Sequence, residues 1–338
     1  MTLVSKPKER HTMETKILKQ ALEGDVSAAN RVLKYLSSAN LTLRRLMQEA
    51  IYDLADSRLW MNLLNCLALQ RWNDNLDCER RSDLAASQRI DQSIIEVFIE
   101  DGSEEDKSIK ESALVRGLDD LRPQVRLMAA YLLGLRGDER AIPVLSESLD
   151  SGSKDWQLRT IHALESIGDE RCGPLLFRAL IGDQGEVHRE AGRALIRLGR
   201  LAESTWLEAL DHPDNHIRWH GARGLGNIGD ARYADKLAEG LLDDNQAVRW
   251  ATADVLAHLG VRAVPATLTI ISQRKLNEQS RQAVYHALHG MTSRQIQQRV
   301  QPLLDALHGT AASIEAPAVA QHLLMKWEKF NNVKSSQT

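Results

Sequence analysis

Apolar and small residues recur with the period of an amphipathic helix through the middle of the chain. The pattern is anchored on one position in each of six segments. The residue before this position is mostly apolar, the residues three and four after it are mainly small, and the residue seven after it is leucine. The equivalent positions are Arg126, Gln157, His188, Arg218, Arg249 and Arg281, and the leucines are Leu133, Leu164, Leu195, Leu225, Leu256 and Leu288. This spacing predicts helices with one buried face, and the small residues let neighbouring helices approach closely.

A glycine follows each of these helices except the last. The glycines are Gly137, Gly168, Gly199, Gly229 and Gly260, with Thr292 in the sixth place, so the repeat is 30–32 residues long. Glycine readily adopts the left-handed conformation that ends a helix. An Asp-x-Arg turn such as Asp138–Arg140 comes next, and then a second helix with a proline such as Pro143 in its first turn. Each unit is therefore predicted to be a helical hairpin that hides its apolar face by stacking on its neighbours.

The whole unit, D-x-x-V-R-x-x-A-A-x-x-L-G-x-x-G-D-x-R-A-x-P-x-L, resembles the short HEAT-like repeats of the phycobilin-lyase type over residues 119–291. The resemblance implies an all-α fold, a right-handed α-solenoid of HEAT-like helical hairpins. Repeats of this type occur in bilin lyases, adaptors, immunity proteins and many uncharacterised bacterial proteins. They are therefore specific for the fold and do not select one function.

The same pattern divides the chain into four parts. We expect a disordered N-terminus (1–15), irregular N-terminal helical repeats with a polar insertion at 70–89 (16–118), regular repeats (119–292), and C-terminal capping helices with a loose tail (293–338). Helices outside the regular repeats are predicted at 14–36 with a break near Gly24, and at 41–54, 60–69, 90–100, 108–118, 295–307 and 316–329. Atypical ends are expected of a repeat array, because its terminal repeats must face water.

Composition argues against several classes of protein. The net charge of −3 gives no strong field toward nucleic acid or a membrane surface. Three scattered cysteines provide neither a disulfide framework nor a zinc site. The N-terminus lacks an apolar signal core, and no apolar run looks long enough to cross a bilayer. We expect a cytoplasmic monomer without membrane insertion.

Candidate binding residues are found at the outward positions of the first helix in each repeat, which should line a concave groove. Trp219 and Trp250 occupy the same position in adjacent repeats, and Arg193, Arg223 and Asp254 share another column with His162 and His286 at its flanks. The predicted partner-binding set is Trp219, Trp250, Arg193, Arg223, Arg197, Asp254, His220, His162, His258, Tyr131, Leu127 and Met128. Large aromatic residues beside arginine are common anchors at interfaces.

Other conspicuous residues have a structural explanation. Leu127, Met128 and Tyr131 form an apolar patch that needs covering by a partner or by the N-terminal segment. Trp156 and Trp206 should pack inside, given how much area an indole buries. The arginines at the equivalent positions and in the Asp-x-Arg turns are expected to join neighbouring repeats and to cap turns.

Signatures of enzymes are weak in this sequence. Asp254 and His258 lie four residues apart, a spacing that metal ligands use, but no His-Glu-x-x-His is present. There is no glycine-rich phosphate loop and no G-x-S-x-G. We therefore expect no catalytic residues, no metal and no cofactor.

The sequence favours a non-catalytic scaffold or adaptor that grips a partner protein in its concave groove. One alternative is a bilin lyase-like or chaperone-type enzyme, with Trp219 and Trp250 as aromatic walls, Arg193 and Arg223 for the propionates of a tetrapyrrole, and Asp254 near its pyrrole nitrogens. A second alternative is a DNA-binding HEAT-like protein of the alkylpurine glycosylase type. There Trp250 and Asp254, one helical turn apart, would face the damaged nucleotide, and Arg193, Arg197 and Arg223 would meet phosphates. The slight negative charge argues against this second alternative.

Overall fold

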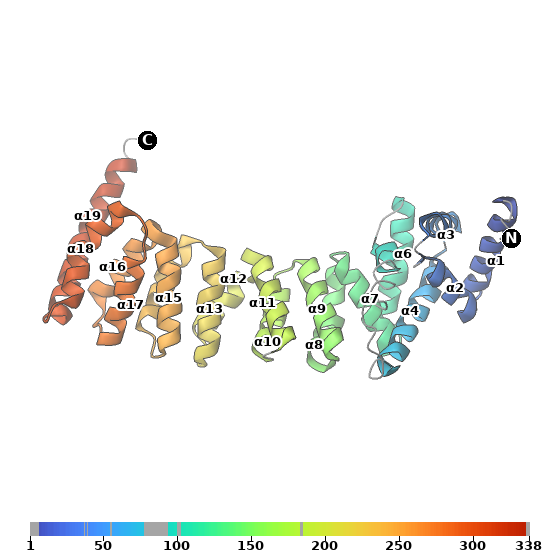
Figure 1. The fold of residues 1–338 in the computed structure, drawn as a ribbon, viewed down its shortest axis with the longest axis horizontal. Coiled ribbons are helices and arrows are strands. Elements are labelled where there is room, and N and C mark those ends of the chain that lie inside the picture. The colour runs from blue at the N-terminus through green and yellow to red at the C-terminus, as the bar shows by residue number, and fades with distance from the viewer. Residues whose placement is uncertain are drawn as a thin grey trace. The chain divides into compact units, whose positions relative to one another are not determined.

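The computed structural model describes residues 7–36, 38, 40–54, 56–77, 94–99, 103–182 and 185–335. It divides into two compact units, Met1–Ala194 and Leu195–Thr338. Over the described residues the chain is helical and contains no strand, and within each unit consecutive helices pack side by side (Figure 1). The predicted all-α fold of stacked helical hairpins is confirmed.

The first unit holds the irregular repeats and the first regular ones. Its helices are α1 (Pro7–Leu22), α2 (Val26–Leu36), α3 (Leu41–Leu54), α4 (Ser57–Asp77), a stretch at 94–99, α6 (Glu104–Leu118), α7 (Pro123–Leu135), α8 (Ile142–Ser151), α9 (Lys154–Ile167), α10 (Cys172–Gly182) and α11 (Glu186–Leu198), which crosses the unit boundary. α3 has the predicted bounds, and α1 and α2 are separated at Gly24 as expected. Two expectations need correction, because α1 begins at Pro7, inside the segment predicted to be disordered, and α4 extends into the predicted insertion. The insertion beyond Asp77 lies outside the described residues.

The second unit holds the later repeats and the C-terminal helices. They are α12 (Glu203–Leu210), α13 (Asn215–Ile228), α14 (Ala234–Glu239), α15 (Gln246–Leu259), α16 (Val264–Gln273), α17 (Glu278–His289), α18 (Arg294–His308) and α19 (Ala312–Ser335). α19 packs on both α16 and α18, as a capping element should. It ends at Ser335, so much of the tail predicted to be loose is helical.

The repeat pattern explains the core of both units. All six predicted leucines, from Leu133 to Leu288, are at most 1% exposed, and the five predicted glycines have φ between 55° and 79°. Trp156 and Trp206 are buried as predicted. Small residues allow close packing: a Cβ added to Gly224 would lie 2.1 Å from the ring of Trp206.

The arginines of the repeats hold turns and loops, as predicted. Asp138 caps the short 3-10 helix Glu139–Ala141, and Arg140 pairs with Asp138 and with Glu111 of the preceding hairpin. Arg171 likewise pairs with Asp169 and with Glu139. The hydrogen bond from Arg140 lowers the pKa of Asp138, and the one from Arg171 lowers the pKa of Asp169.

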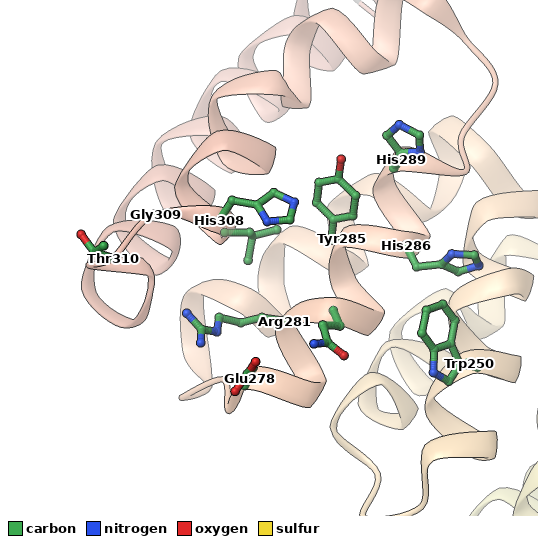
Figure 2. Close-up of a pocket in the computed structure, with 11 residues that line it drawn as sticks. Trp250, Glu278, Arg281, Tyr285, His286, His289, His308, Gly309 and Thr310 are labelled. Carbon is green, nitrogen blue, oxygen red and sulfur yellow. The ribbon is translucent and has the colours of Figure 1, made fainter.

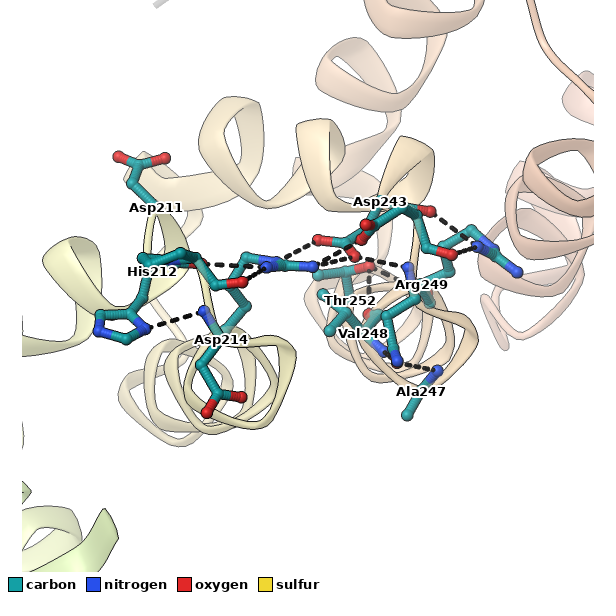
Figure 3. Close-up of polar contacts among 12 residues, drawn as sticks. Asp211, His212, Asp214, Asp243, Ala247, Val248, Arg249 and Thr252 are labelled. Atoms are coloured by element: carbon teal, nitrogen blue, oxygen red, sulfur yellow. Dashed lines mark hydrogen bonds and ion pairs between the residues drawn. The ribbon is translucent and has the colours of Figure 1, made fainter.

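At five of the six equivalent positions the side chain bonds to the backbone just before its own helix. The Nη1 atom of Arg249 donates to the carbonyl oxygens of Asp243 at 2.7 Å and Asp244 at 3.0 Å (Figure 3). The Nη1 atoms of Arg126 and Arg218 likewise donate to the carbonyl oxygens of the residues five and six positions earlier. Gln157 and His188 each bond to the backbone carbonyl eight positions earlier. Arg218 also bonds to the carboxylates of Asp243 and Asp244.

The predicted apolar patch on the first regular repeat is covered from within its own unit. Met128 is 2% and Tyr131 8% exposed, because α7 packs against α4, α6 and α9. The edge of the Trp156 ring meets Tyr131 at a centroid distance of 6.1 Å. Leu127 is only partly exposed. The N-terminal part of the chain, one of the two expected coverings, thus supplies α4 and α6 over Met128 and Tyr131, and a role of these three residues in partner binding stays a prediction.

One stretch, Gln246–Gln273, is long and apolar enough to cross a membrane by length and composition. This differs from the expectation that no apolar run is long enough. The stretch consists of α15 and α16, separated by the turn at Gly260, and 56% of its most apolar window is buried inside the structure. Packing within the unit accounts for its hydropathy.

Candidate functional site

The candidate site begins at Trp250 on α15 of the second unit. Its ring is 36% exposed although the neighbouring residues Arg249 and Ala251 are buried. The Trp250 ring and the imidazole of His286 on α17 meet edge to face, with the centroids 4.6 Å apart and the planes at 68°. α15 and α17 pack directly on each other, so the repeat period brings the two aromatic side chains together. An indole held partly open in this way can cover the face of a flat ligand.

His286 is also held by Asp254, one helical turn after Trp250. The His286 Nε2 atom lies 2.6 Å from Asp254 Oδ1. A carboxylate only accepts hydrogen bonds, so it selects the tautomer of His286 with hydrogen on Nε2 and leaves Nδ1 as an acceptor. An imidazole oriented by a carboxylate is well suited to move protons. The sequence had placed His286 beside this column, and the structure brings it into direct contact with Asp254.

A cavity of about 640 Å³ opens beside Trp250 and His286. α15, α17 and the turn between α18 and α19 form its walls (Figure 2). Its lining residues are Trp250, Glu278, Arg281, Gln282, Tyr285, His286, His289, Leu307, His308, Gly309 and Thr310. The volume falls within the range of about 300–1,000 Å³ that holds drug-sized ligands.

The wall opposite Trp250 is aromatic and was not anticipated from the sequence. The ring of Tyr285 meets the ring edge of His308 at 4.4 Å and stacks on His289 at 5.4 Å. Figure 2 shows Tyr285 and His308 side by side in the close-up. His308 ends α18, outside the repeat period, so the column alignment could not find it. The only signal available was the clustering of histidines near the C-terminus.

Trp219, the second predicted anchor, does not line this cavity. It is half-buried on α13, where its ring stacks on His216 at 6.2 Å and meets His220 at 4.8 Å. The Arg223 Cζ atom lies 4.8 Å from the centroid of the Trp219 ring. Trp219 therefore contacts neighbours on its own helix, whereas Trp250 contacts the next repeat. α13 and α15 pack together, but a shared role for the two indoles stays a prediction.

The remaining predicted residues are on the surface. His162 on α9 and Arg193 on α11 belong to the first unit, where Arg193 pairs with Glu190. Arg197 is exposed near the unit boundary, in the second unit. His258 bonds through Nδ1 to the backbone carbonyl of Asp254 at 3.1 Å, so its ring turns back along α15. No group of three or more His, Cys, Asp or Glu side chains in the described part of the chain could hold a metal ion.

The family model described as HEAT repeats matches residues 111–196, 173–257 and 203–289, together more than half of the chain. The bilin biosynthesis protein PecE of Mastigocladus laminosus is 28% identical over 167 residues, which are 46% of this chain and 62% of that relative. The chain thus spans less than two thirds of the relative it matches.

Two solved structures align with this chain at low similarity. The complex of CpcE and CpcF of phycocyanin lyase from Nostoc sp. is 19% identical, with 73% of this chain and 91% of that chain covered and a TM-score of 0.28. An engineered protein is 16% identical, with 96% of both chains covered and a TM-score of 0.32. These TM-scores are too low for either likeness to bear on function.

These comparisons correct the expectation of a non-catalytic chain. The similar curated protein takes part in bilin biosynthesis, which overturns the prediction that the chain is not an enzyme. The bilin alternative raised from the sequence fits this relative better than the scaffold does.

Proposed function

We propose, from the premise that this chain belongs to the HEAT-repeat family, that it binds an open-chain tetrapyrrole (a bilin) and carries out a lyase-type reaction on it with a partner protein. The observation that carries the proposal is the arrangement of Trp250, His286 and Asp254 at the edge of the cavity. The similarity to a bilin biosynthesis protein supports the choice of ligand.

The cavity suits the chemistry of a bilin. A bilin is a long conjugated molecule with two carboxylate side chains and four pyrrole-type nitrogens. Trp250 and Tyr285 offer aromatic surface for the conjugated rings, and Arg281 with the neighbouring histidines offers donors for carboxylates. The site is smaller than the groove expected from the sequence, and it uses Tyr285 and His308 in place of Trp219 and Arg223.

His286 is proposed to exchange protons with the bilin. Asp254 orients its imidazole, and the lining of the cavity places it within reach of a ligand there. A lyase-type reaction on a conjugated chain needs a proton added or removed as a bond forms or breaks, and a positioned imidazole is the side chain that most often does this. Asp254 acts through His286 and is a positioning residue.

The partly exposed cluster of Trp219, His220 and Arg223 is proposed to contact the partner protein. A half-buried indole beside arginine is typical of interface anchors.

The nucleic-acid alternative gains nothing from the same region. Two charged groups of the predicted strip are already bonded, Arg193 to Glu190 and Asp254 to His286. Such pairing reduces the charge available for phosphates.

Titration of the full chain with biliverdin, followed by visible absorption, tests the proposed function. We expect the bilin band to shift and sharpen on binding, and the substitution Trp250→Ala to weaken binding about tenfold or more, because it removes one aromatic wall. Trp327→Ala is the matched control, since Trp327 is a partly exposed indole of the same unit that does not line the cavity. An absorption spectrum unchanged by the wild-type protein would reject the proposal.

A further inference from the structure

Arg281 departs from the other residues at its position in the repeat. In the five preceding repeats the equivalent side chain bonds to a backbone carbonyl oxygen five to eight residues earlier, as Arg249 does to Asp243 and Asp244. The Arg281 guanidinium makes no such bond within the described residues, and its Nε atom is buried without a hydrogen-bond partner there. In the sixth repeat, Arg281 therefore does not tie its helix to the preceding backbone, although the sequence pattern predicts this role for it.

The Arg281 guanidinium lies in the wall of the cavity, on the same helix as Tyr285 and His286 (Figure 2). Glu278, one turn earlier on α17, also lines the cavity. No ion pair joins Glu278 to Arg281 among the described residues, although their spacing on the helix permits one. The positive charge of Arg281 thus remains available to a ligand.

A buried donor without a partner is costly, and a ligand that supplies an acceptor removes that cost. A carboxylate suits a guanidinium best, because its two oxygens match the planar fork of N–H groups. A hydroxyl or carbonyl ligand would satisfy only one donor and leave the charge unbalanced. The cavity therefore selects a ligand that carries a carboxylate near its aromatic body.

We infer that Arg281 binds a carboxylate of the ligand, which on the proposed function is a propionate side chain of the bilin. Trp250 and Tyr285 cover the conjugated part of the same molecule, and His286 of α17 faces it beside Trp250. This inference rests on the proposed function, and it identifies Arg281 as the side chain that distinguishes the free acid of the bilin from its ester. It makes Arg281 a specificity-determining residue.

Equilibrium binding of biliverdin and of biliverdin dimethyl ester to the full chain tests the inference. The wild type should bind the free acid about tenfold or more tightly than the ester, since only the acid forms a charge-assisted pair. Arg281→Gln should weaken binding of the acid to the level of the ester and leave the ester unchanged. Arg281→Lys keeps the charge without the fork and should give an intermediate preference. Arg274→Gln, an exposed arginine outside the cavity lining, is the matched control for loss of charge.

The outcomes separate this inference from the proposed function. Equal affinity of the wild type for acid and ester, or an unchanged preference in Arg281→Gln, would overturn the role of Arg281 while bilin binding stands. Absence of binding of both ligands to the wild type would overturn the proposed function and the inference with it. Should Arg281→Gln fail to fold by circular dichroism, the preference of Arg281→Lys decides, and full retention of the wild-type ratio there counts against the inference.

Discussion

His286 Nε2 lies 2.6 Å from Asp254 Oδ1, although the two residues are 32 positions apart in the chain. One repeat length separates them, so the stacking of successive hairpins creates this contact. The pair is half open to solvent: the side chain of His286 is 39% exposed and that of Asp254 65%. Such exposure makes the pair weak as a stabilising element and leaves it accessible to a ligand.

Asp254→Asn should therefore slow the bilin reaction without destabilising the protein. We expect the rate with saturating bilin and partner to fall about tenfold or more, because the amide no longer selects one tautomer of His286. The free energy of unfolding should change by less than about 1 kcal/mol, as for other exposed pairs. Single-turnover kinetics and urea unfolding measure the two effects. Asp235→Asn, an exposed aspartate on α14, should leave both unchanged.

The close packing of α13 on Trp206 predicts a large effect from one methyl group. An alanine Cβ at Gly224 would lie 2.1 Å from the Trp206 ring, which is 3% exposed and cannot move away. Gly224→Ala should lower the free energy of unfolding by about 1–3 kcal/mol. At Gly182, the last residue of α10, an added Cβ meets nothing within 4 Å, so Gly182→Ala should be close to neutral. Equal stability of both variants in urea unfolding would contradict this packing.

The turn carboxylates predict how stability depends on pH. The hydrogen bond from Arg140 lowers the folded pKa of Asp138 below its unfolded value of about 3.9. A lowered pKa means that the contribution is fully present above the unfolded pKa and is lost as the pH falls through the folded pKa. Asp138→Ala should lower the free energy of unfolding by about 1 kcal/mol at pH 7, because it removes both the ion pair with Arg140 and the cap of the 3-10 helix. The difference from the wild type should shrink as the pH falls below the unfolded value of about 3.9 and through the lower folded pKa of Asp138.

Urea unfolding of Asp138→Ala and of the wild type across this pH range measures that difference. The control Asp235→Ala should show a small effect that does not follow the same titration. A cost for Asp138→Ala that stayed constant down to pH 2 would argue against the ionised pair as its source.

Separate roles for Trp219 and Trp250 give a further prediction. Trp219→Ala should weaken capture of the partner protein several-fold, because it removes the anchor beside Arg223, while the affinity for biliverdin stays at the wild-type level. Trp250→Ala should weaken binding of biliverdin and leave capture of the partner protein at the wild-type level. Pull-down with mass spectrometry and absorption titration on the same preparations measure both. If both substitutions weakened bilin binding alike, the site would extend over α13 and the division of roles would be wrong.

The fold follows from the sequence because its rules are local and repeat. Each glycine that ends a helix, such as Gly229, and each leucine seven residues after an equivalent position, such as Leu225 after Arg218, obeys backbone and packing constraints within one hairpin. Burial of Met128 and Tyr131 could not be predicted in this way. It depends on α4 and α6, whose packing on α7 no column alignment describes.

The site was predictable only where it uses the period of the repeats. Trp250, Asp254 and His286 follow from aligning repeats, because one repeat length brings them together. His308 comes from the turn after α18, and its approach to Tyr285 depends on how the C-terminal helices pack. The missing contact of Arg281 could not be predicted, because Arg218 and Arg249 are the same residue type at equivalent positions and do make the contact.

A crystal structure of the full chain with biliverdin tests the central claim most directly. The account predicts density for the bilin in the cavity, with its conjugated body between Trp250 and Tyr285. Density for the bilin against Trp219 on α13, with the cavity empty, would contradict it.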